Sequence, residues 1–226
     1  MSTNIGVVMF PGSNCDYDAL EAVQAFGATA HILWHNTEDL SNIDAVILPG
    51  GFSYGDYLRP GALARFSAII GQVKKFAALG GPVVGICNGF QVLTEAGLLP
   101  GVLQKNKGLK FICDNIKVKV EADSVLTHDA QRGSILEIPI SHFEGNFTCD
   151  YATLEELESQ DRIILRYEDN PNGSMGDIAG ICNKQRNVVG LMPHPERAYN
   201  SIIGSGDGEI LIKSLLNSAS IFSDSK

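Results

Sequence analysis

The sequence has little of what marks membrane, nucleic-acid-binding or disulfide-stabilised proteins. No run of 18 apolar residues is present, so we expect no membrane span. Basic residues number 17 against 26 acidic ones, and the formal net charge of −9 gives little attraction for a phosphate backbone, so nucleic acid is not an expected partner. The five cysteines include no C-x-x-C pair, and no basic segment followed by an apolar run opens the chain, which together predict a reduced, cytoplasmic protein.

Linkers, repeats and low-complexity segments are also missing, and this predicts a single domain over residues 1–226. The composition is 44% hydrophobic and 19% charged, which is enough apolar material for a core and excludes the disordered and fibrous classes. A chain of this length needs no metal or disulfide to hold its fold.

Apolar runs alternate with helical patterns through the first half of the chain. The predicted strands are residues 5–10, 30–34, 45–48 and 82–86, and the predicted helices are residues 16–26, 62–78 and 88–96. Strands that are apolar throughout and alternate with helices are typical of parallel sheets covered on both faces.

The second half has a different pattern. Residues 116–120 and 135–140 alternate between apolar and polar side chains, as half-exposed antiparallel strands do. Further strands are predicted over residues 163–167, 178–182 and 188–192, with a closing helix over residues 209–221. We therefore predict an α/β fold with an open, mostly parallel, flavodoxin-like sheet, helices on both faces and an antiparallel extension.

The most informative motif is Gly85-Ile86-Cys87-Asn88-Gly89, which joins a predicted buried strand to a helix. A Gly-x-Cys-x-Gly turn has the form of a nucleophile elbow with cysteine in place of serine. The glycines permit close packing around the strained turn, and the N-terminus of the following helix favours a thiolate. Cys87 is therefore the predicted nucleophile. The other interpretation, a buried cysteine without chemistry, is the one we expect for the other four cysteines.

A cysteine nucleophile needs a base, and His194 follows a predicted buried strand at the edge where open α/β sheets gather catalytic groups. Glu196 lies two residues on, and the flanking prolines keep this stretch extended, so the two side chains can project to the same side. We predict that the Glu196 carboxylate orients the imidazole and stabilises its charged form. Taken alone, the His-x-Glu pattern also fits a surface turn.

Acyl transfer also needs donors for an oxyanion. The elbow offers the backbone N–H of Asn88, and we expect a second donor from Gly50, Gly51 or Phe52, in a glycine loop that follows the third predicted strand. The alternative for that loop is a simple turn.

We predict no metal site. His31 and His35 have i, i+4 spacing but flank an apolar run that fits a strand, so structural roles are expected for them. His142 and Glu144 follow another predicted strand and are candidates to line a pocket.

Several segments, in order along the chain, resemble a known family. GICNGFQVL together with MPHPE resembles the class I, triad-type glutamine amidotransferases, which hydrolyse the side-chain amide of glutamine and pass the ammonia to a synthetase. More closely, FPGSNCDYD, LPGGFSYGDYLRPGALARF, HFEGNF and NGSMGDIAG resemble the family of glutaminase subunits of phosphoribosylformylglycinamidine synthases. The likeness covers nearly the whole chain and implies the class I glutamine amidotransferase fold.

The resemblance implies Cys87 as nucleophile, His194 as base and then acid, and Glu196 as the carboxylate that orients it. The residues implied for substrate binding are Gly51, Phe52 and Asn88 around the carbonyl oxygen, Gln91 on the glutamine, and the Ser141, His142 and Phe143 backbone at its amino-acid end. The family commonly has His-Gly-Glu-Gly where this chain has His-Phe-Glu-Gly, so Phe143 either narrows the glutamine pocket or packs under a partner.

The implied function is hydrolysis of L-glutamine to glutamate and ammonia, with the ammonia passed to the synthetase subunit of phosphoribosylformylglycinamidine synthase, in purine biosynthesis. No GxxxxGK[ST] loop is present, so we expect no cofactor in this chain and place ATP and magnesium in the synthetase subunit. The resemblance also implies a further small subunit. The alternatives are a glutaminase for a different synthetase, a stand-alone cysteine hydrolase of similar fold, and a binding module whose cysteine is incidental.

Overall fold

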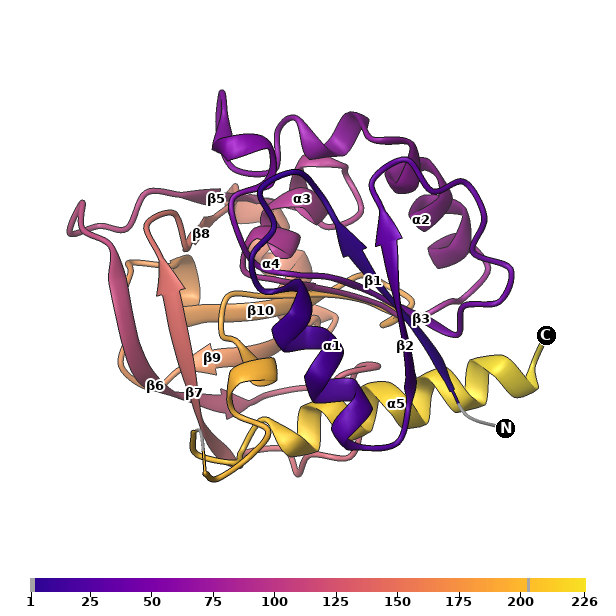
Figure 1. Cartoon of the computed structure of the whole chain (residues 1–226). Coiled ribbons are helices and arrows are strands. Elements are labelled where there is room, and N and C mark those ends of the chain that lie inside the picture. Colours follow the sequence, from indigo (N-terminus) through magenta and orange to yellow (C-terminus); the bar gives the residue numbers. More distant parts are fainter. Residues whose placement is uncertain (1–2, 203) are drawn as a thin grey trace.

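A nine-stranded sheet forms the centre of the computed structural model, which describes residues 3–202 and 204–226 (Figure 1). The strand order is β2-β1-β3-β4-β11-β10-β9-β6-β7, so strands from both halves of the chain share one sheet. A second, two-stranded sheet pairs β5 (Val102–Gln104) with β8 (Asn146–Thr148).

One part of the large sheet is parallel. Its strands are β1 (Asn4–Met9), β2 (Thr29–Trp34), β3 (Ala45–Leu48), β4 (Val83–Ile86) and β11 (Val188–Leu191). The order β2-β1-β3-β4 is that of flavodoxin-like sheets, in which the chain changes direction across the sheet between β1 and β3. The carboxyl ends of these parallel strands meet at one edge, where such folds place their ligands.

The other part is antiparallel, as the alternating sequence pattern predicts. Its strands are β6 (Ile112–Val120), β7 (Ile135–His142), β9 (Ile163–Tyr167) and β10 (Ile178–Cys182). Along β7 every second residue is buried, so one face of this strand packs on the core and the other faces outward. The predicted α/β fold with a mostly parallel sheet and an antiparallel extension is confirmed.

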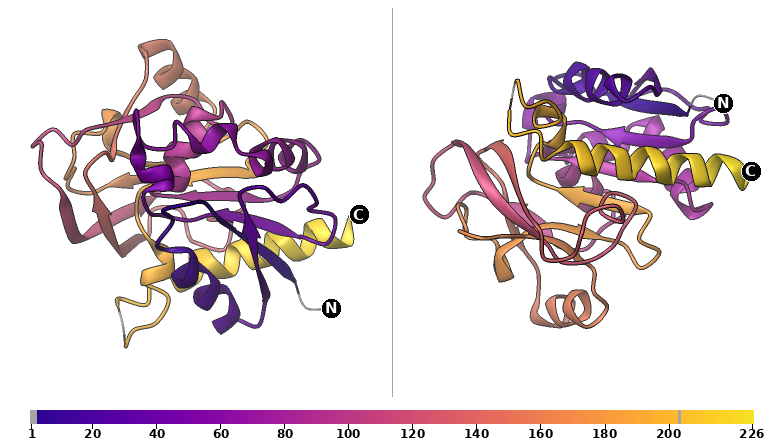
Figure 2. Two further views of the ribbon diagram at one scale, coloured as in Figure 1. Left: turned by 45° about the horizontal axis from the view of Figure 1, so that its top comes forward. Right: turned by 90° about the horizontal axis from the view of Figure 1, so that it is seen from below.

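Helices cover both faces of the parallel part. α1 (Asp16–Ala25) and α5 (Glu209–Asp224) contact each other on one face, and α2 (Ala68–Ala78) and α3 (Asn88–Glu95) lie on the other. α4 (Tyr151–Ser159) lies beside the antiparallel strands, away from α1 and α5 (Figure 2). No helix within the described residues is long and apolar enough to cross a membrane.

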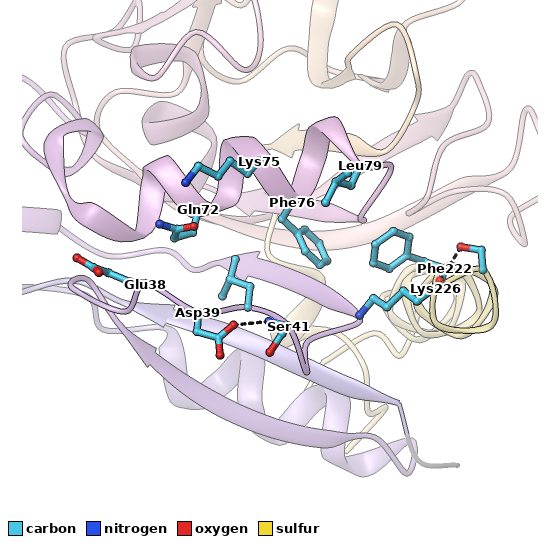
Figure 3. A pocket seen from close by; sticks show the side chains of 11 residues that line it. Glu38, Asp39, Ser41, Gln72, Lys75, Phe76, Leu79, Phe222 and Lys226 are labelled. Atoms are coloured by element: carbon cyan, nitrogen blue, oxygen red, sulfur yellow. Dashed lines mark hydrogen bonds between the residues drawn. The ribbon is translucent and has the colours of Figure 1, made fainter.

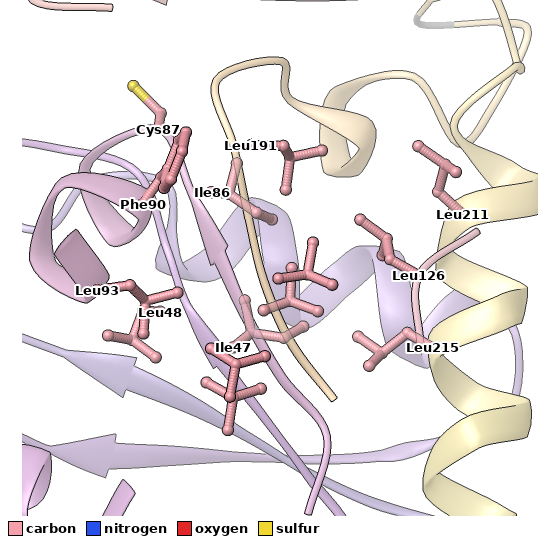
Figure 4. Packing of buried hydrophobic residues seen from close by; sticks show 14 of the residues in the cluster. Ile47, Leu48, Ile86, Cys87, Phe90, Leu93, Leu126, Leu191, Leu211 and Leu215 are labelled. Atoms are coloured by element: carbon pink, nitrogen blue, oxygen red, sulfur yellow. The ribbon is translucent and has the colours of Figure 1, made fainter. Parts of the chain in front are cut away.

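The core extends through the sheet from one helical layer to the other. Ile86 of β4 and Leu191 of β11 are almost fully buried, and they lie between Phe90 of α3 and Leu215 of α5 (Figure 4). Because the strand residues contact helices on both sides, they are apolar without alternation, which is the pattern that predicts a parallel sheet.

The predicted helix over residues 62–78 is wrong in its first turns. α2 begins at Ala68, because Ser67 has extended backbone angles, φ −66° and ψ 145°. A short 3-10 turn, η2 (Ala64–Phe66), precedes it, and Gly61 has a φ of +78°. A Cβ on Gly61 would come within 2.7 Å of the Val92 nitrogen, so close contact with α3 fixes this loop and interrupts the helix.

Three short elements have no counterpart in the prediction, namely α4, β5 and β8. α4 begins after Asp150, whose Oδ1 accepts a hydrogen bond from the Thr153 N–H at 2.7 Å, the usual N-cap arrangement. Of its residues only Leu157 is buried, so this helix has too weak an apolar stripe to be recognised from periodicity.

Gly89 and Gly71 give a matched pair for testing the packing of the elbow. A Cβ on Gly89 would lie 1.9 Å from the Leu48 carbonyl oxygen, whereas a Cβ on Gly71, inside α2, would meet nothing within 4 Å. We expect Gly89→Ala to lower the free energy of unfolding by about 3 kcal/mol or more, since backbone must move. Gly71→Ala should raise it by about 0.5–1 kcal/mol. Urea denaturation followed by circular dichroism measures both, and equal stability of the two variants would contradict this packing.

Candidate active site

Cys87 lies between β4 and α3 in a strained turn. Its backbone angles are φ 51° and ψ −104°, a region that residues other than glycine rarely adopt. A Cβ on Gly85 would come within 2.6 Å of the Gly89 backbone, so the two glycines of the motif let strand and helix approach closely. The Cys87 N–H donates to the Leu191 carbonyl oxygen at 2.8 Å, which aligns the turn with the end of β11. This is the geometry predicted for a nucleophile elbow.

The Cys87 thiol faces the antiparallel extension. It is 6% exposed and donates to the Ser141 carbonyl oxygen at an Sγ–O distance of 3.7 Å. Figure 4 shows its sulfur beyond the end of β4, on the side of the carboxyl edge. Cys87 is also the residue that precedes α3, so the N-terminal end of that helix dipole favours the thiolate.

His194 and Glu196 form a buried pair just after β11. His194 Nδ1 and Glu196 Oε1 are 2.6 Å apart, and both side chains are almost fully buried. The His194 backbone N–H donates to the Pro139 carbonyl oxygen of β7 at 2.8 Å. Gly50 lies behind the ring, since a Cβ there would come within 2.8 Å of the His194 Cε1 atom. The predicted contact between His194 and Glu196 is therefore present, but Pro195–Arg197 form a short 3-10 turn, η4, and not the extended stretch that was predicted.

Nε2, the other ring nitrogen of His194, has no hydrogen-bond partner among the described residues. Burial disfavours the charged imidazolium most strongly, but the Glu196 carboxylate and the Cys15 and Cys87 thiols together raise the pKa of His194 well above 6.5. The ring is thus suited to hold a proton taken from a thiol.

Asn88 and Gly51 are the better-placed oxyanion donors. Asn88 is the first residue of α3, so its N–H has no acceptor within that helix. The N–H of Phe52 donates to the Gly12 carbonyl oxygen at 3.0 Å, so Phe52 is not available as a donor unless that bond breaks. Gly51 lines the pocket next to Cys87, whereas Gly50 is not among the residues that line it.

Gln91 reaches the pocket, but its amide is already bonded within the protein. Its Oε1 accepts from Asn88 Nδ2 at 2.9 Å, and its Nε2 donates to the Glu144 carbonyl oxygen at 2.6 Å. Asn88 Nδ2 also lies 3.3 Å from Asp56 Oδ1. In this arrangement Gln91 connects α3 to the segment after β7, and the substrate contact expected of it needs one of these bonds to open.

Ser141, His142 and Phe143 all line the same pocket as Cys87. His142 Nδ1 bonds to Asn106 Oδ1 at 3.1 Å, and its Nε2 is buried without a partner among the described residues. Burial, and then the nearby charge of His194, lower the pKa of His142 to about 4, so this ring is neutral at physiological pH. Phe143 is half-buried at the pocket wall, with the Lys105 Nζ 5.8 Å from its ring centre. Phe143 thus lies at the pocket, and both of its predicted roles, narrowing the pocket and packing under a partner, stay predictions.

Four residues that line the pocket were not identified from the sequence, namely Asn14, Cys15, Asp56 and Arg197. Cys15 precedes α1, and its Sγ accepts from Arg197 Nη2 at 3.1 Å, while Arg197 Nε donates to Asp18 Oδ2 at 2.9 Å. Cys15 follows the carboxyl end of a predicted parallel strand, so the argument that selected the nucleophile and the base also applied to it.

Cys15, His194 and Glu196 offer donor atoms within 4.8 Å of one another, a set that meets the distance requirement for a metal among the described residues. His194 Nδ1 is already bonded to Glu196, and a metal held between them would break that bond. We therefore assign His194 and Glu196 to the hydrogen-bonded pair and not to a metal site.

A hollow of about 490 Å³ lies elsewhere, between α2, the end of α5 and the loop before β3 (Figure 3). Its side chains include Glu38, Lys75, Phe76, Phe222 and Lys226. Among the described residues that line it there is neither a cysteine nor a histidine. The hollow at Cys87 is far smaller, about 70 Å³, and most of the predicted site residues line it, although Gly50, Asn88 and Glu196 do not.

Comparisons with known proteins agree with this fold and site. The family described as CobB/CobQ-like glutamine amidotransferase domain matches residues 2–208. The phosphoribosylformylglycinamidine synthase subunit PurQ of Rubrobacter xylanophilus is 57% identical over 96% of this chain and 99% of its own length. The corresponding subunit of Koribacter versatilis is 52% identical over 93% of this chain and 96% of its own length. A chain in the structure of PurLQS from Thermotoga maritima aligns with a TM-score of 0.88 and 42% identity, covering 96% of this chain and 99% of that one.

The fold and the family match define the class, which is that of the glutamine amidotransferases. Within this class the chain belongs to the PurQ family, the family of the phosphoribosylformylglycinamidine synthase subunits to which it is similar over almost its full length. The resemblance read from its motifs is confirmed.

The raised pKa of His194 can be tested at Glu196. In Glu196→Gln the ring stays buried but loses the carboxylate charge, so we expect the pKa of His194 to fall. Histidine Cε1 resonances followed by NMR over pH report this directly, and Glu209→Gln, in an exposed pair with Lys213, is the control. An unchanged His194 titration in Glu196→Gln would contradict the assignment.

The same pair has a consequence for stability. A pKa that is higher in the folded state means that the stabilisation from the protonated ring is complete below pH 6.5 and is lost as pH rises through the folded-state value. We expect wild type to lose more unfolding free energy than Glu196→Gln over that rise. Urea denaturation at a series of pH values measures the difference.

Proposed function

We propose that this chain is the glutaminase subunit of a phosphoribosylformylglycinamidine synthase. It hydrolyses L-glutamine to glutamate and ammonia and supplies the ammonia to a synthetase that converts formylglycinamide ribonucleotide to formylglycinamidine ribonucleotide with ATP. The observation that carries the proposal is the strained Cys87 elbow in one pocket with His194, whose Nδ1 lies 2.6 Å from Glu196. The near full-length similarity to PurQ subunits supports the choice of synthetase.

The first half of the reaction forms a thioester. The Cys87 thiol passes its proton to His194 Nε2, and the resulting thiolate attacks the carboxamide carbon of glutamine. The backbone N–H groups of Asn88 and Gly51 stabilise the negative oxygen that develops. His194 then gives its proton to the leaving nitrogen, the C–N bond breaks, and ammonia departs from a glutamyl thioester on Cys87.

The second half removes the glutamyl group. His194, now neutral, takes a proton from water, and the hydroxide attacks the thioester carbon. The C–S bond breaks, and the thiol regains its proton from the imidazolium as glutamate leaves. Glu196 holds the same ring through both halves, since its Oε1 stays bonded to Nδ1.

The synthetase and a further small subunit are the proposed partners. The structure from Thermotoga maritima to which this chain is similar is that of PurLQS, a name that joins PurQ with two further components, PurL and PurS. This supports such a complex. We place ATP and magnesium in the synthetase and the reaction in the cytoplasm. We propose further that residues 1–226 act as one domain, since the large sheet draws strands from both halves of the chain.

The pocket argues against one form of the stand-alone cysteine hydrolase, a peptidase. At about 70 Å³ it is far smaller than the roughly 300–1,000 Å³ of sites for drug-sized ligands, which suits a short unbranched group rather than a polypeptide. A peptidase would cleave peptides and ignore free glutamine, so the two activities are easily separated.

Cys87→Ser tests the division of labour. In the complex with its synthetase, we expect this variant to lose the glutamine-driven reaction by at least 10²-fold and to keep the reaction driven by ammonium salt, since ammonia bypasses the nucleophile. Product formation with each nitrogen source is the measurement. Cys113→Ser, on the exposed side of β6, is the control and should keep both reactions.

Loss of both reactions in Cys87→Ser, or of neither, would contradict the proposed function. Mass spectrometry of wild type quenched with glutamine should also show a glutamyl adduct on Cys87 and none on Cys113.

A further inference from the structure

The carbonyl oxygens at the wall of the pocket are already bonded. Ser141 O accepts from the Cys87 thiol, and His142 O accepts from Asn106 Nδ2 at 3.0 Å. Phe143 O accepts from the Asn106 N–H at 2.8 Å, and Glu144 O accepts from Gln91. Each of these oxygens keeps one lone pair for a ligand, but none carries the negative charge that binds an ammonium group most strongly, although the sequence resemblance assigns the amino-acid end of glutamine to this segment.

Two carboxylates face the same pocket. Asp56, in the loop after β3, and Glu144, after β7, both line it and are half-buried. Neither forms an ion pair within residues 3–202 and 204–226, and the guanidinium of the pocket, that of Arg197, is paired with Asp18. Two partly buried negative charges without a cation are unfavourable unless a ligand supplies one.

Hydrogen bonds from Asn106 hold His142 at the wall of this pocket. Asn106 Nδ2 donates to the Lys110 and His142 carbonyl oxygens, so its Oδ1 accepts, and His142 Nδ1 must carry the hydrogen. His142 Nε2 is then an acceptor, 3% exposed as a residue and unpartnered among the described residues. The two carboxylates that line the pocket favour a ligand that carries a positive charge.

We propose that Asp56 and Glu144 bind the α-ammonium group of glutamine and so restrict the substrate to amides that carry this group. The inference rests on the proposed function, because it names the groups that recognise the substrate of that same site. Asn88 connects the proposed ammonium site to the reacting thiol. Its Nδ2 bonds to Asp56, and its backbone directly follows Cys87.

The state of Asp56 supports the assignment. Burial, and then the charge of Glu144, raise the pKa of Asp56 to about 6, which shows that its negative charge is poorly compensated. Asp56 also has a φ of 53°, which asparagine tolerates as well as aspartate, so Asp56→Asn removes the charge without a new backbone strain.

The test compares glutamine with glutaramate, which is glutamine without its α-amino group, on the assembled complex. For Asp56→Asn and for Glu144→Gln we expect KM for glutamine to rise about 10- to 100-fold with kcat little changed, the effect of losing a hydrogen bond to a charged group. The kcat/KM for glutaramate should stay at the wild-type value, since that substrate has no ammonium group. Asp39→Asn, exposed in the distant hollow of Figure 3, is the matched control and should change neither substrate.

Calorimetric titration of glutamine into complexes that also carry Cys87→Ser gives affinity without turnover and should show the same loss. The inference is overturned if the ratio of kcat/KM for glutamine to that for glutaramate is unchanged in both variants. It is also overturned if kcat/KM falls equally for the two substrates. Failure of wild type to hydrolyse glutamine contradicts the proposed function instead, so the two failures are told apart by the wild-type reaction.

Discussion

The site depends on the close contact between Gly89 and the carbonyl oxygen of Leu48. This contact places the first turn of α3 directly on the end of β3, with no side chain between them. It therefore fixes the distance from the nucleophile, at the start of α3, to the glycine loop that follows β3. A larger residue at position 89 would separate the Cys87 thiol from Gly51, one of the proposed oxyanion donors, even if every side chain proposed as catalytic remained.

The antiparallel part of the sheet contributes to the site as well as to the core. Pro139 of β7 accepts the backbone N–H of His194, and Ser141 at the end of the same strand accepts the Cys87 thiol. Base and nucleophile thus both bond to one strand, which keeps them in register although they are 107 positions apart in sequence, counted from 87 to 194. The extension therefore supports Cys87 and His194 in addition to the parallel part, which holds Cys87 through the Leu191 carbonyl oxygen.

Local patterns predicted the parts of the protein that depend on local physics. The continuous apolar strands, the Gly-x-Cys-x-Gly turn and the histidine after the last parallel strand all follow from burial or from where strands end. The break in the helix before Ala68 could not be predicted from local patterns. It results from the contact of Gly61 with α3, which is distant in sequence. Asp56 was missed for the same reason: nothing in its neighbours along the chain shows that folding brings it to Glu144.

The position of Cys15 bears on how the nucleophile can be identified by chemical modification. Two thiols line one small pocket, and a side chain on Gly50 would touch both Cys15 and the imidazole of His194. An alkyl group on Cys15 would crowd the same ring that serves Cys87. Inactivation by an alkylating reagent, and protection from it by glutamine, therefore do not identify which sulfur reacted until the modified peptide has been sequenced.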